Sequence, residues 1–213
     1  MRRLLLVRHA STRATRAAAF PVDEPLDEPG RAAAAALAAA LPARCDVVCS
    51  PAARCLQTAE AAGLEARVDA VLAECDFGSW AGLRLADVDA DGARAWMLDP
   101  DAVPHGGESL RAFAARVARW LDAEAERDGT ALAITHGGVI KAAVAHALGA
   151  PLEAFWRIDA APLSVTEVHA HDGRWTVARV NDALEPARPR VGALASLREP
   201  EAFALNPARR GGS

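Results

Sequence analysis

Two continuous apolar segments, each followed by a histidine, constrain the fold of this sequence more than any other feature. Residues 4–7, Leu-Leu-Leu-Val, run directly into Arg8 and His9, and residues 130–135, Thr-Ala-Leu-Ala-Ile-Thr, run into His136. Such runs are typical of strands buried on both faces, as in a parallel sheet. A buried cation or imidazole is costly without a partner. The ends of these strands are therefore the first candidates for a functional site.

Helical patterns alternate with the strand-like segments along the chain. An alanine-rich segment, residues 31–41, favours a helix because alanine has the best helix propensity. Ser50 is expected as the N-cap of the next helix, with Pro51 at its first position and Gly63 past its end. A later helix carries its apolar residues on one face, namely Leu110, Phe113, Ala114, Val117 and Leu121. Further strands are expected at residues 3–7, 45–50 and 66–72, and Asp172-Gly173 marks a β-hairpin within residues 163–180.

This alternation predicts an α/β fold, a three-layer sandwich with a mostly parallel central sheet and helices on both faces. Residues 73–110 are irregular and suggest a small insertion over the carboxyl end of the strands. We expect one catalytic domain over residues 1–182 and a Pro- and Arg-rich tail, loosely ordered, over residues 183–213.

Composition excludes some classes of protein. A net charge of −4 argues against a nucleic-acid partner. No stretch approaches the roughly 18 apolar residues of a membrane span, so no membrane partner is expected. The four cysteines lack CxxC spacing, which favours reduced thiols in a cytoplasmic protein. Lys141 is the only lysine, and we interpret this as codon bias. The oligomeric state stays open, with a homodimer as one alternative.

The polar residues at the strand ends indicate an anion site. In open α/β sheets ligands bind at the carboxyl ends of the strands. Arg8 and His9 follow the first strand, Arg54 lies in the first turn of the helix after the second, and His136 is followed by two glycines that open a helix. Guanidinium groups match phosphate oxygens with a planar fork of donors, and helix N-termini favour anions. We therefore expect a phosphate-binding site.

Five segments in this order, "LVRHASTRAT", "SPAARCLQTAE", "AECDFGSWAGL", "GGES" and "ITHGGVI", resemble the histidine phosphatase superfamily, which includes the cofactor-dependent phosphoglycerate mutases. The resemblance covers residues 3–181. It is greatest to the compact phosphatase branch that includes α-ribazole phosphatase.

The resemblance implies a role for each motif residue. His9 is the nucleophile that forms a phosphohistidine, and its proton is disfavoured by adjacent cations. Arg8, Arg54 and His136 bind the phosphoryl oxygens and stabilise the charge of the transition state. Glu74 donates a proton to the leaving oxygen and then accepts one from the attacking water. No metal and no cofactor is implied, because the cationic side chains stabilise the charge.

The sequence departs from the family pattern at several positions. The first motif commonly continues with Gly and Glu, where this chain has Ala10 and Ser11. A phosphate-contacting Asn commonly stands at Thr15, whose hydroxyl we carry over as a phosphate ligand. Ala81 replaces a frequent Glu. These changes bear on substrate choice and rate rather than on the core reaction.

Other residues are weighed against these candidates. Asp76 and Glu108 are the alternatives to Glu74 as the acid. We expect Cys55 and Cys75 to be packing residues. Trp80 and Trp96 are expected in the core or in a cover over the site, and a wall of the substrate pocket is the open alternative for either. The remaining histidines are interpreted as surface or hairpin residues: His105, His146, His169 and His171.

The leading hypothesis is a metal-independent phosphomonoesterase that acts on a small phosphorylated metabolite, with α-ribazole phosphate as one candidate. Open alternatives are a mutase, a protein-phosphohistidine phosphatase and a non-catalytic phosphate-binding regulator. A mutase needs an extended basic cover that excludes water, whereas only about thirty residues separate Glu74 from Gly106. That stretch carries two arginines, Arg84 and Arg94. Because binding alone does not need a nucleophile and an acid, the motif set favours an enzyme.

Overall fold

The computed structural model describes residues 1–37, 39, 41, 42 and 45–183. Six strands form one sheet in the order β3-β2-β4-β1-β5-β6. The strands are β1 (Arg2–Arg8), β2 (Asp46–Cys49), β3 (Arg67–Val68), β4 (Gly129–Thr135), β5 (Val165–His171) and β6 (Arg174–Asp182). Strands β3, β2, β4 and β1 are parallel neighbours, and β5 runs antiparallel to both β1 and β6. The expected mostly parallel sheet is confirmed.

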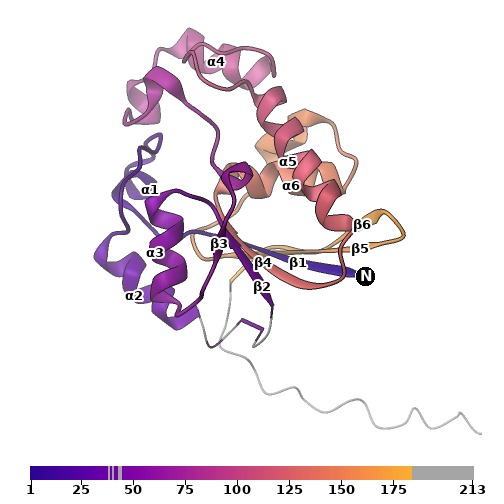
Figure 1. Cartoon of the computed structure of the whole chain (residues 1–213). Coiled ribbons are helices and arrows are strands. Elements are labelled where there is room, and N and C mark those ends of the chain that lie inside the picture. Colours follow the sequence, from indigo (N-terminus) through magenta and orange to yellow (C-terminus); the bar gives the residue numbers. More distant parts are fainter. Residues whose placement is uncertain (38, 40, 43–44, 184–213) are drawn as a thin grey trace, which may run out of the picture.

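Helices cover both faces of this sheet (Figure 1). Helices α5 (Leu110–Ala125) and α6 (Gly137–Ala147) pack on one face, and α2 (Glu28–Leu37) and α3 (Ala53–Ala61) on the other. Alternate residues of β1 face opposite layers: Leu4 and Leu6 join the core under α5 and α6, whereas Leu5 and Val7 join the core that contains Leu37 of α2. The central strands are thus buried on both faces, which explains their continuous apolar sequence.

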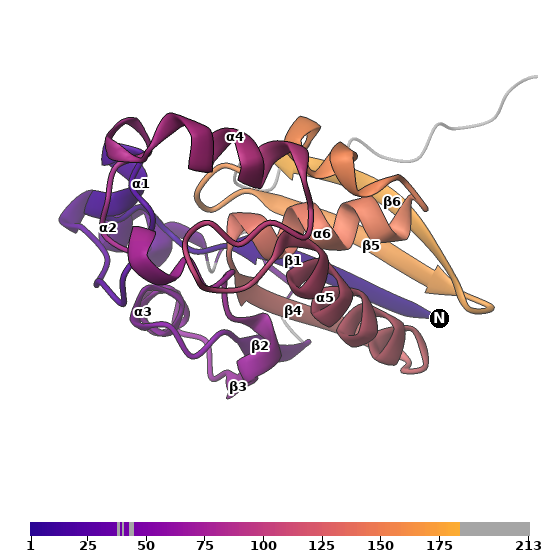
Figure 2. The same cartoon turned by 90° about the horizontal axis from the view of Figure 1, so that it is seen from above.

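An insertion between β3 and α5 lies over the α5 and α6 side (Figure 2). It contains three-residue 3₁₀ turns at Gly78–Trp80 and Leu85–Asp87 and the helix α4 (Ala90–Leu98). We call residues 75–105 the cover. Five aromatic side chains in or beside the cover pack edge to face or tilted, with ring centroids of contacting pairs 4.7–5.8 Å apart: Phe20, Phe77, Trp80, Trp96 and Trp156. These contacts hold the cover in place by aromatic packing rather than by ion pairs.

Several local expectations are confirmed and two are wrong. The Asp172-Gly173 turn joins β5 and β6, with φ of 48° and 69°, as a two-residue hairpin of positive φ requires. Gly63 follows α3 with φ of 66°. Ser50, however, is not the N-cap of α3. The helix begins at Ala53 and Ala52 caps it without a side-chain hydrogen bond. The Ser50 hydroxyl accepts from the Ala52 backbone N–H at 3.4 Å and has a second partner, described below.

The third strand is much shorter than residues 66–72. Only Arg67 and Val68 pair with β2, and the chain then turns into a 3₁₀ helix at Ala70–Leu72 that is capped by the Asp69 carboxylate. The short helix α1 (Arg13–Ala17) follows β1. The expected tail lies outside the described residues from 184 onward. None of the helices in the described part of the chain combines the length and the apolar character of a membrane-spanning helix.

Candidate active site

The strand order places the polar strand ends side by side. Strands β2, β4 and β1 are neighbours, so Ser50, His136 and His9, which follow them, meet at one edge of the sheet. The backbone N–H of His9 donates to the carbonyl oxygen of Thr135 at 2.8 Å. The imidazole rings of His9 and His136 then lie with centroids 5.3 Å apart. The convergence that the sequence could only suggest is therefore present in the fold.

One hydrogen bond sets the position of the proton on His9. The Nδ1 atom lies 2.7 Å from the carbonyl oxygen of Ala10, which can only accept, so Nδ1 carries the proton and Nε2 keeps its lone pair. The side chain is buried. Burial, reinforced by the Arg54 and Arg8 cations, lowers the pKa of His9 to about 3. His9 is therefore a neutral imidazole with a free Nε2 at neutral pH, as a nucleophile requires.

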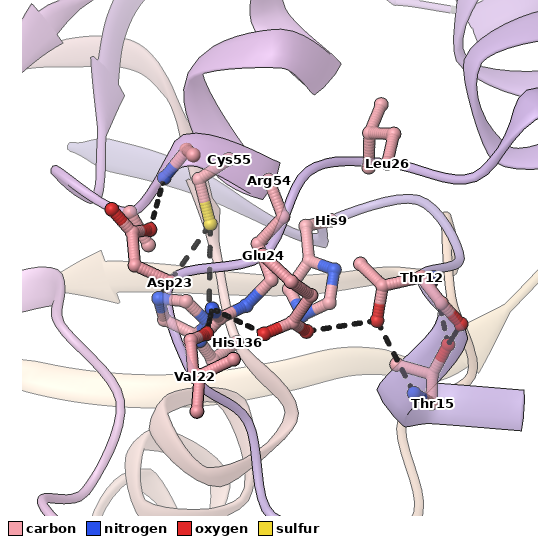
Figure 3. Close-up of polar contacts among 12 residues, drawn as sticks. His9, Thr12, Thr15, Val22, Asp23, Glu24, Leu26, Arg54, Cys55 and His136 are labelled. Atoms are coloured by element: carbon pink, nitrogen blue, oxygen red, sulfur yellow. Dashed lines mark hydrogen bonds and ion pairs between the residues drawn. The ribbon is translucent and has the colours of Figure 1, made fainter. Parts of the chain in front are cut away.

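His136 has a fixed proton as well. A guanidinium nitrogen of Arg54, Nη2, donates to His136 Nδ1 at 3.2 Å, so the ring proton is on Nε2, which donates to Ser50 Oγ at 2.7 Å. Burial and then the charge of Arg54 lower the pKa of His136 well below its usual value. Cys55 packs against the same ring, with Sγ 3.6 Å from Nε2 (Figure 3). Burial raises the pKa of the Cys55 thiol, so this cysteine is a packing group, as expected.

Two guanidinium groups, one buried (Arg54) and one half-buried (Arg8), flank these histidines. Arg8 donates from Nη1 to the carbonyl oxygen of Ala160 at 2.6 Å, and Arg54 from Nη1 to that of Val22 at 2.8 Å. The Nε atoms of both arginines are buried and have no hydrogen-bond partner among the described residues. Buried donors without partners are costly. The two groups are therefore suited to an anion with several acceptor oxygens, such as a phosphoryl group.

Glu74 is held at the N-terminus of α6. Its carboxylate accepts from the backbone N–H of Gly138 and of Cys75, each at 3.1 Å. A side chain at Gly138 would place its Cβ atom 2.2 Å from Glu74 Oε1, so only glycine admits the carboxylate here. Glu74 also lines two hollows, one shared with Arg8 and one with Arg54. A phosphoryl group held between the two arginines thus has Glu74 beside it.

The two alternative acids have other partners. Asp76 accepts from the backbone N–H of Gly78 at 2.9 Å, in an exposed turn. Glu108 forms an ion pair with Arg116 at 2.7 Å. Neither residue lines the hollows that Glu74 shares with the arginines. The geometry therefore favours Glu74 as the candidate acid.

Thr15 is the one predicted ligand that the structure does not bring to the cluster. Its hydroxyl donates to the carbonyl oxygen of Thr12 at 2.8 Å and accepts from the backbone N–H of Thr12 at 2.9 Å, within a reciprocal cap at the start of α1. Its role as a phosphate ligand stays a prediction that requires the hydroxyl to change partner.

The other departures from the family pattern are accommodated locally. Ala10 is fully buried and is not among the residues with positive φ, so an alanine causes no backbone strain there. Ser11 Oγ donates to the Asp27 carboxylate at 2.8 Å, and Asp27 forms an ion pair with Arg16. A carboxylate is thus present beside this motif, but Asp27 supplies it in place of the frequent Glu.

Sequence reasoning missed three residues of the cluster. Ser50 holds His136, and its position directly after an apolar strand was the available signal. Glu24 accepts from Thr12 Oγ1 at 2.9 Å and lies 3.8 Å from Arg54 Nη1 (Figure 3). Lys141 lies one turn into α6, and burial lowers its pKa. Its spacing of three residues from Gly138 places it on the same helix face, which was a second usable signal.

The remaining histidines are of two kinds. His146 pairs with Asp122 at 2.7 Å, His169 pairs with Glu167 at 2.7 Å, and His171 is exposed in the hairpin, as expected. His105 is not a surface residue. It is 2 % exposed at the end of the cover, with its ring 5.0 Å from that of Trp80. Its sequence position in a polar, glycine-rich stretch gave no sign of this burial.

No group of three or more His, Cys, Asp or Glu side chains gathers as a metal site would need among the described residues. The four cysteines are free thiols. Independence of metal ions remains a prediction, which chelation can test.

An α/β sandwich with two neutral histidines, two arginines and a carboxylate at the carboxyl ends of its strands defines a class of phosphoryl-binding proteins. A sequence model of the histidine phosphatase superfamily (branch 1) matches residues 4–183. The chain belongs to this superfamily.

Two curated relatives carry the names of phosphatases. The chain is 42% identical over 106 residues to the glucosyl-3-phosphoglycerate phosphatase of Mycobacterium tuberculosis, covering 44% of this chain and 48% of that protein. It is 30% identical over 135 residues to the adenosylcobalamin/alpha-ribazole phosphatase of Escherichia coli, covering 58% of this chain and 66% of that protein. A structure of mycobacterial glucosyl-3-phosphoglycerate phosphatase with VO3 matches with a TM-score of 0.74 at 32% identity, over 86% of this chain and 100% of that chain.

The curated matches are partial. A bifunctional protein of Mycobacterium tuberculosis is 36% identical over 146 residues, and the match covers 63% of this chain and 40% of that protein. The chain thus spans less than half the length of this relative.

Proposed function

We propose that this protein is a phosphomonoester hydrolase that needs no metal ion and works through a phosphohistidine on His9. The observation that carries the proposal is the state of His9, a buried neutral imidazole with its proton fixed on Nδ1 between two guanidinium groups. A group that only binds phosphate does not need a free imidazole nitrogen at the anion site. The relatives named as phosphatases support the same reaction type.

The residues suffice for two in-line displacements. In the first, His9 Nε2 attacks phosphorus, the bond from phosphorus to the ester oxygen breaks, and Glu74 gives its proton to the departing alcohol. In the second, Glu74 takes a proton from water, the water oxygen attacks phosphorus, and the bond to Nε2 breaks. Inorganic phosphate leaves, and His9 and Glu74 return to their starting states. Arg8 and Arg54 neutralise the phosphoryl oxygens throughout.

The substrate is proposed only as a small phosphorylated metabolite, with α-ribazole phosphate as one candidate.

Among the other functions, the mutase is the main alternative, and the low free positive charge of the cover argues against it. Arg84, one of two arginines of the cover, is paired with Asp87 at 2.7 Å. The free thiols agree with a cytoplasmic location, which is likewise part of the proposal.

The experiment measures phosphate release from a panel of phosphorylated metabolites by the full chain, after exhaustive chelation. We expect hydrolysis of at least one member, loss of it in His9→Ala, and its retention in the control His171→Ala, which removes an exposed histidine. Activity that His9→Ala retains, or that returns only with added Mg²⁺ or Zn²⁺, would contradict the proposal.

A further inference from the structure

A hollow of about 200 Å³ adjoins the phosphoryl site on the Arg8 side of Glu74. Aromatic side chains form much of its wall: Phe77, Trp96, Phe113, Phe155 and Trp156. Arg8, Glu74, Gly137 and Gly138 belong both to this hollow and to the site. Because Glu74 must reach the leaving oxygen, the alcohol part of the substrate begins at the mouth of this hollow.

Lys141 stands inside the hollow without an anionic partner. Its ammonium group forms no hydrogen bond and no ion pair among the described residues, and its nearest assigned contact is the Phe155 ring, 5.1 Å from Nζ to the centroid. The indole N–H of Trp96, another wall residue, is buried and has no partner either. A partly desolvated cation without a partner is costly, so these two donors of the wall are suited to an anion that the chain itself does not supply.

The carboxylates in reach do not fill this role. Asp159 lies at the rim, and its oxygens accept from the backbone N–H of Ala160 at 2.8 Å and from Asn181 Nδ2 at 3.4 Å. Glu74 accepts from two backbone N–H groups. Both carboxylates attract Lys141 electrostatically, but neither forms an ion pair with it among the described residues.

The position of Lys141 on α6 sets the distance between the two anions of a ligand. Gly137 and Gly138 form the first turn of α6 at the phosphoryl site, and Lys141 follows one turn later on the same face. One helical turn rises about 5.4 Å. A ligand that reaches both places carries its second anionic group only a few bonds from the phosphate.

Resting on the proposed function, we infer that Lys141 selects a leaving group that carries a carboxylate, so that the preferred substrates are small phosphorylated hydroxy acids. The volume agrees, since 200 Å³ is below the range of about 300–1,000 Å³ for sites of drug-sized ligands. The second hollow beside Glu74 has no cation free to bind a carboxylate. Arg54 is the one cation among its lining residues, and it already belongs to the phosphoryl site.

The test compares two substrates that differ in one group, 3-phosphoglycerate with a carboxylate and glycerol 3-phosphate with a hydroxymethyl group in its place. Phosphate release gives kcat/KM for each in the wild type, in Lys141→Met and in Lys141→Arg. A charge-assisted hydrogen bond is worth about ten- to hundredfold in such a ratio. We expect the wild type to prefer 3-phosphoglycerate, Lys141→Met to lose that preference by this factor, and Lys141→Arg to restore much of it.

Two controls separate this inference from other causes. Arg157→Met removes an exposed cation near the hollow and should leave the substrate ratio unchanged. The thermal midpoint of Lys141→Met should not fall, because the variant removes a partly buried charge that has no ion-pair partner among the described residues. A ratio that Lys141→Met leaves unchanged would overturn the inference while phosphatase activity stands. If neither substrate nor any other phosphomonoester is hydrolysed, the proposed function itself fails.

Discussion

At the scale of single residues, the neutral state of two histidines, His9 and His136, defines the site. His9 and His136 are neutral because burial and neighbouring guanidinium groups oppose a third positive charge. Each ring then has one nitrogen fixed by a hydrogen bond, to the Ala10 carbonyl oxygen for His9 and to Ser50 Oγ for His136. The burial that keeps His9 neutral should also make the free energy of unfolding depend on pH.

This burial predicts a pH dependence of stability. Below pH 6.5 an unfolded chain takes up protons on its histidines, whereas folded His9 resists protonation until about pH 3. The free energy of unfolding therefore falls as the pH falls below 6.5, approaching about 1.4 kcal/mol per pH unit for each such histidine. Urea unfolding at pH 7, 6 and 5 should show a smaller fall for His9→Gln than for the wild type. The control His171→Gln should follow the wild type, and equal slopes for His9→Gln and the wild type would contradict the account.

Glu74 allows a second test at this scale. Glu74→Gln keeps the shape and removes the proton that is donated to the leaving oxygen. General acid–base catalysis is worth about 10²–10⁴ in rate. We expect kcat to fall in this range for alkyl phosphates and much less for nitrophenyl phosphate, whose leaving group needs little protonation, with phosphate binding largely kept. An inactive Asp76→Asn beside a nearly normal Glu74→Gln would show that the acid is misassigned.

At the scale of elements, the N-terminus of α6 fixes the acid. The missing side chain of Gly138 is what admits the Glu74 carboxylate. We expect Gly138→Ala to displace this carboxylate and to act like a weaker Glu74→Gln, lowering kcat for alkyl phosphates more than for nitrophenyl phosphate. The comparison of the two substrates in one variant is the control, because a general folding defect would lower both alike. Equal losses would argue against a positioning role of this glycine.

Much of the fold follows from the sequence at this scale, because a strand buried on both faces leaves a continuous apolar run, as in residues 4–7 and 130–135. The strand ends therefore identify His9 and His136. The pattern around Ser50 fits a helix cap equally well, and only the packing of β2 beside β4 decides that the hydroxyl meets His136. Glu24 and His105 are beyond such reasoning, because their positions depend on tertiary contacts of irregular segments, Glu24 near Arg54 and His105 against the Trp80 ring.

At the scale of the whole molecule, the cover determines whether water reaches the phosphoenzyme. It is held by stacked aromatic rings, and one of its two arginines is paired with Asp87. A short cover with so little free positive charge should admit water to the phosphoenzyme. Given 3-phosphoglycerate and catalytic 2,3-bisphosphoglycerate, the protein should release free phosphate and form little 2-phosphoglycerate, when both products are followed together. Rapid 2-phosphoglycerate formation with little free phosphate would favour the mutase.

The central claim is that the phosphoryl group is transferred to Nε2 of His9, and trapping the phosphoenzyme tests it most directly. Labelled substrate is mixed with the full chain, the reaction is stopped in alkaline denaturant, and the site of the label is mapped by fragmentation and compared with the two phosphohistidine isomers. We expect an acid-labile, alkali-stable label on His9, bound through Nε2, absent from His9→Ala and present in His171→Ala. A label on serine, on Nδ1 of His9, or retained in His9→Ala would contradict it.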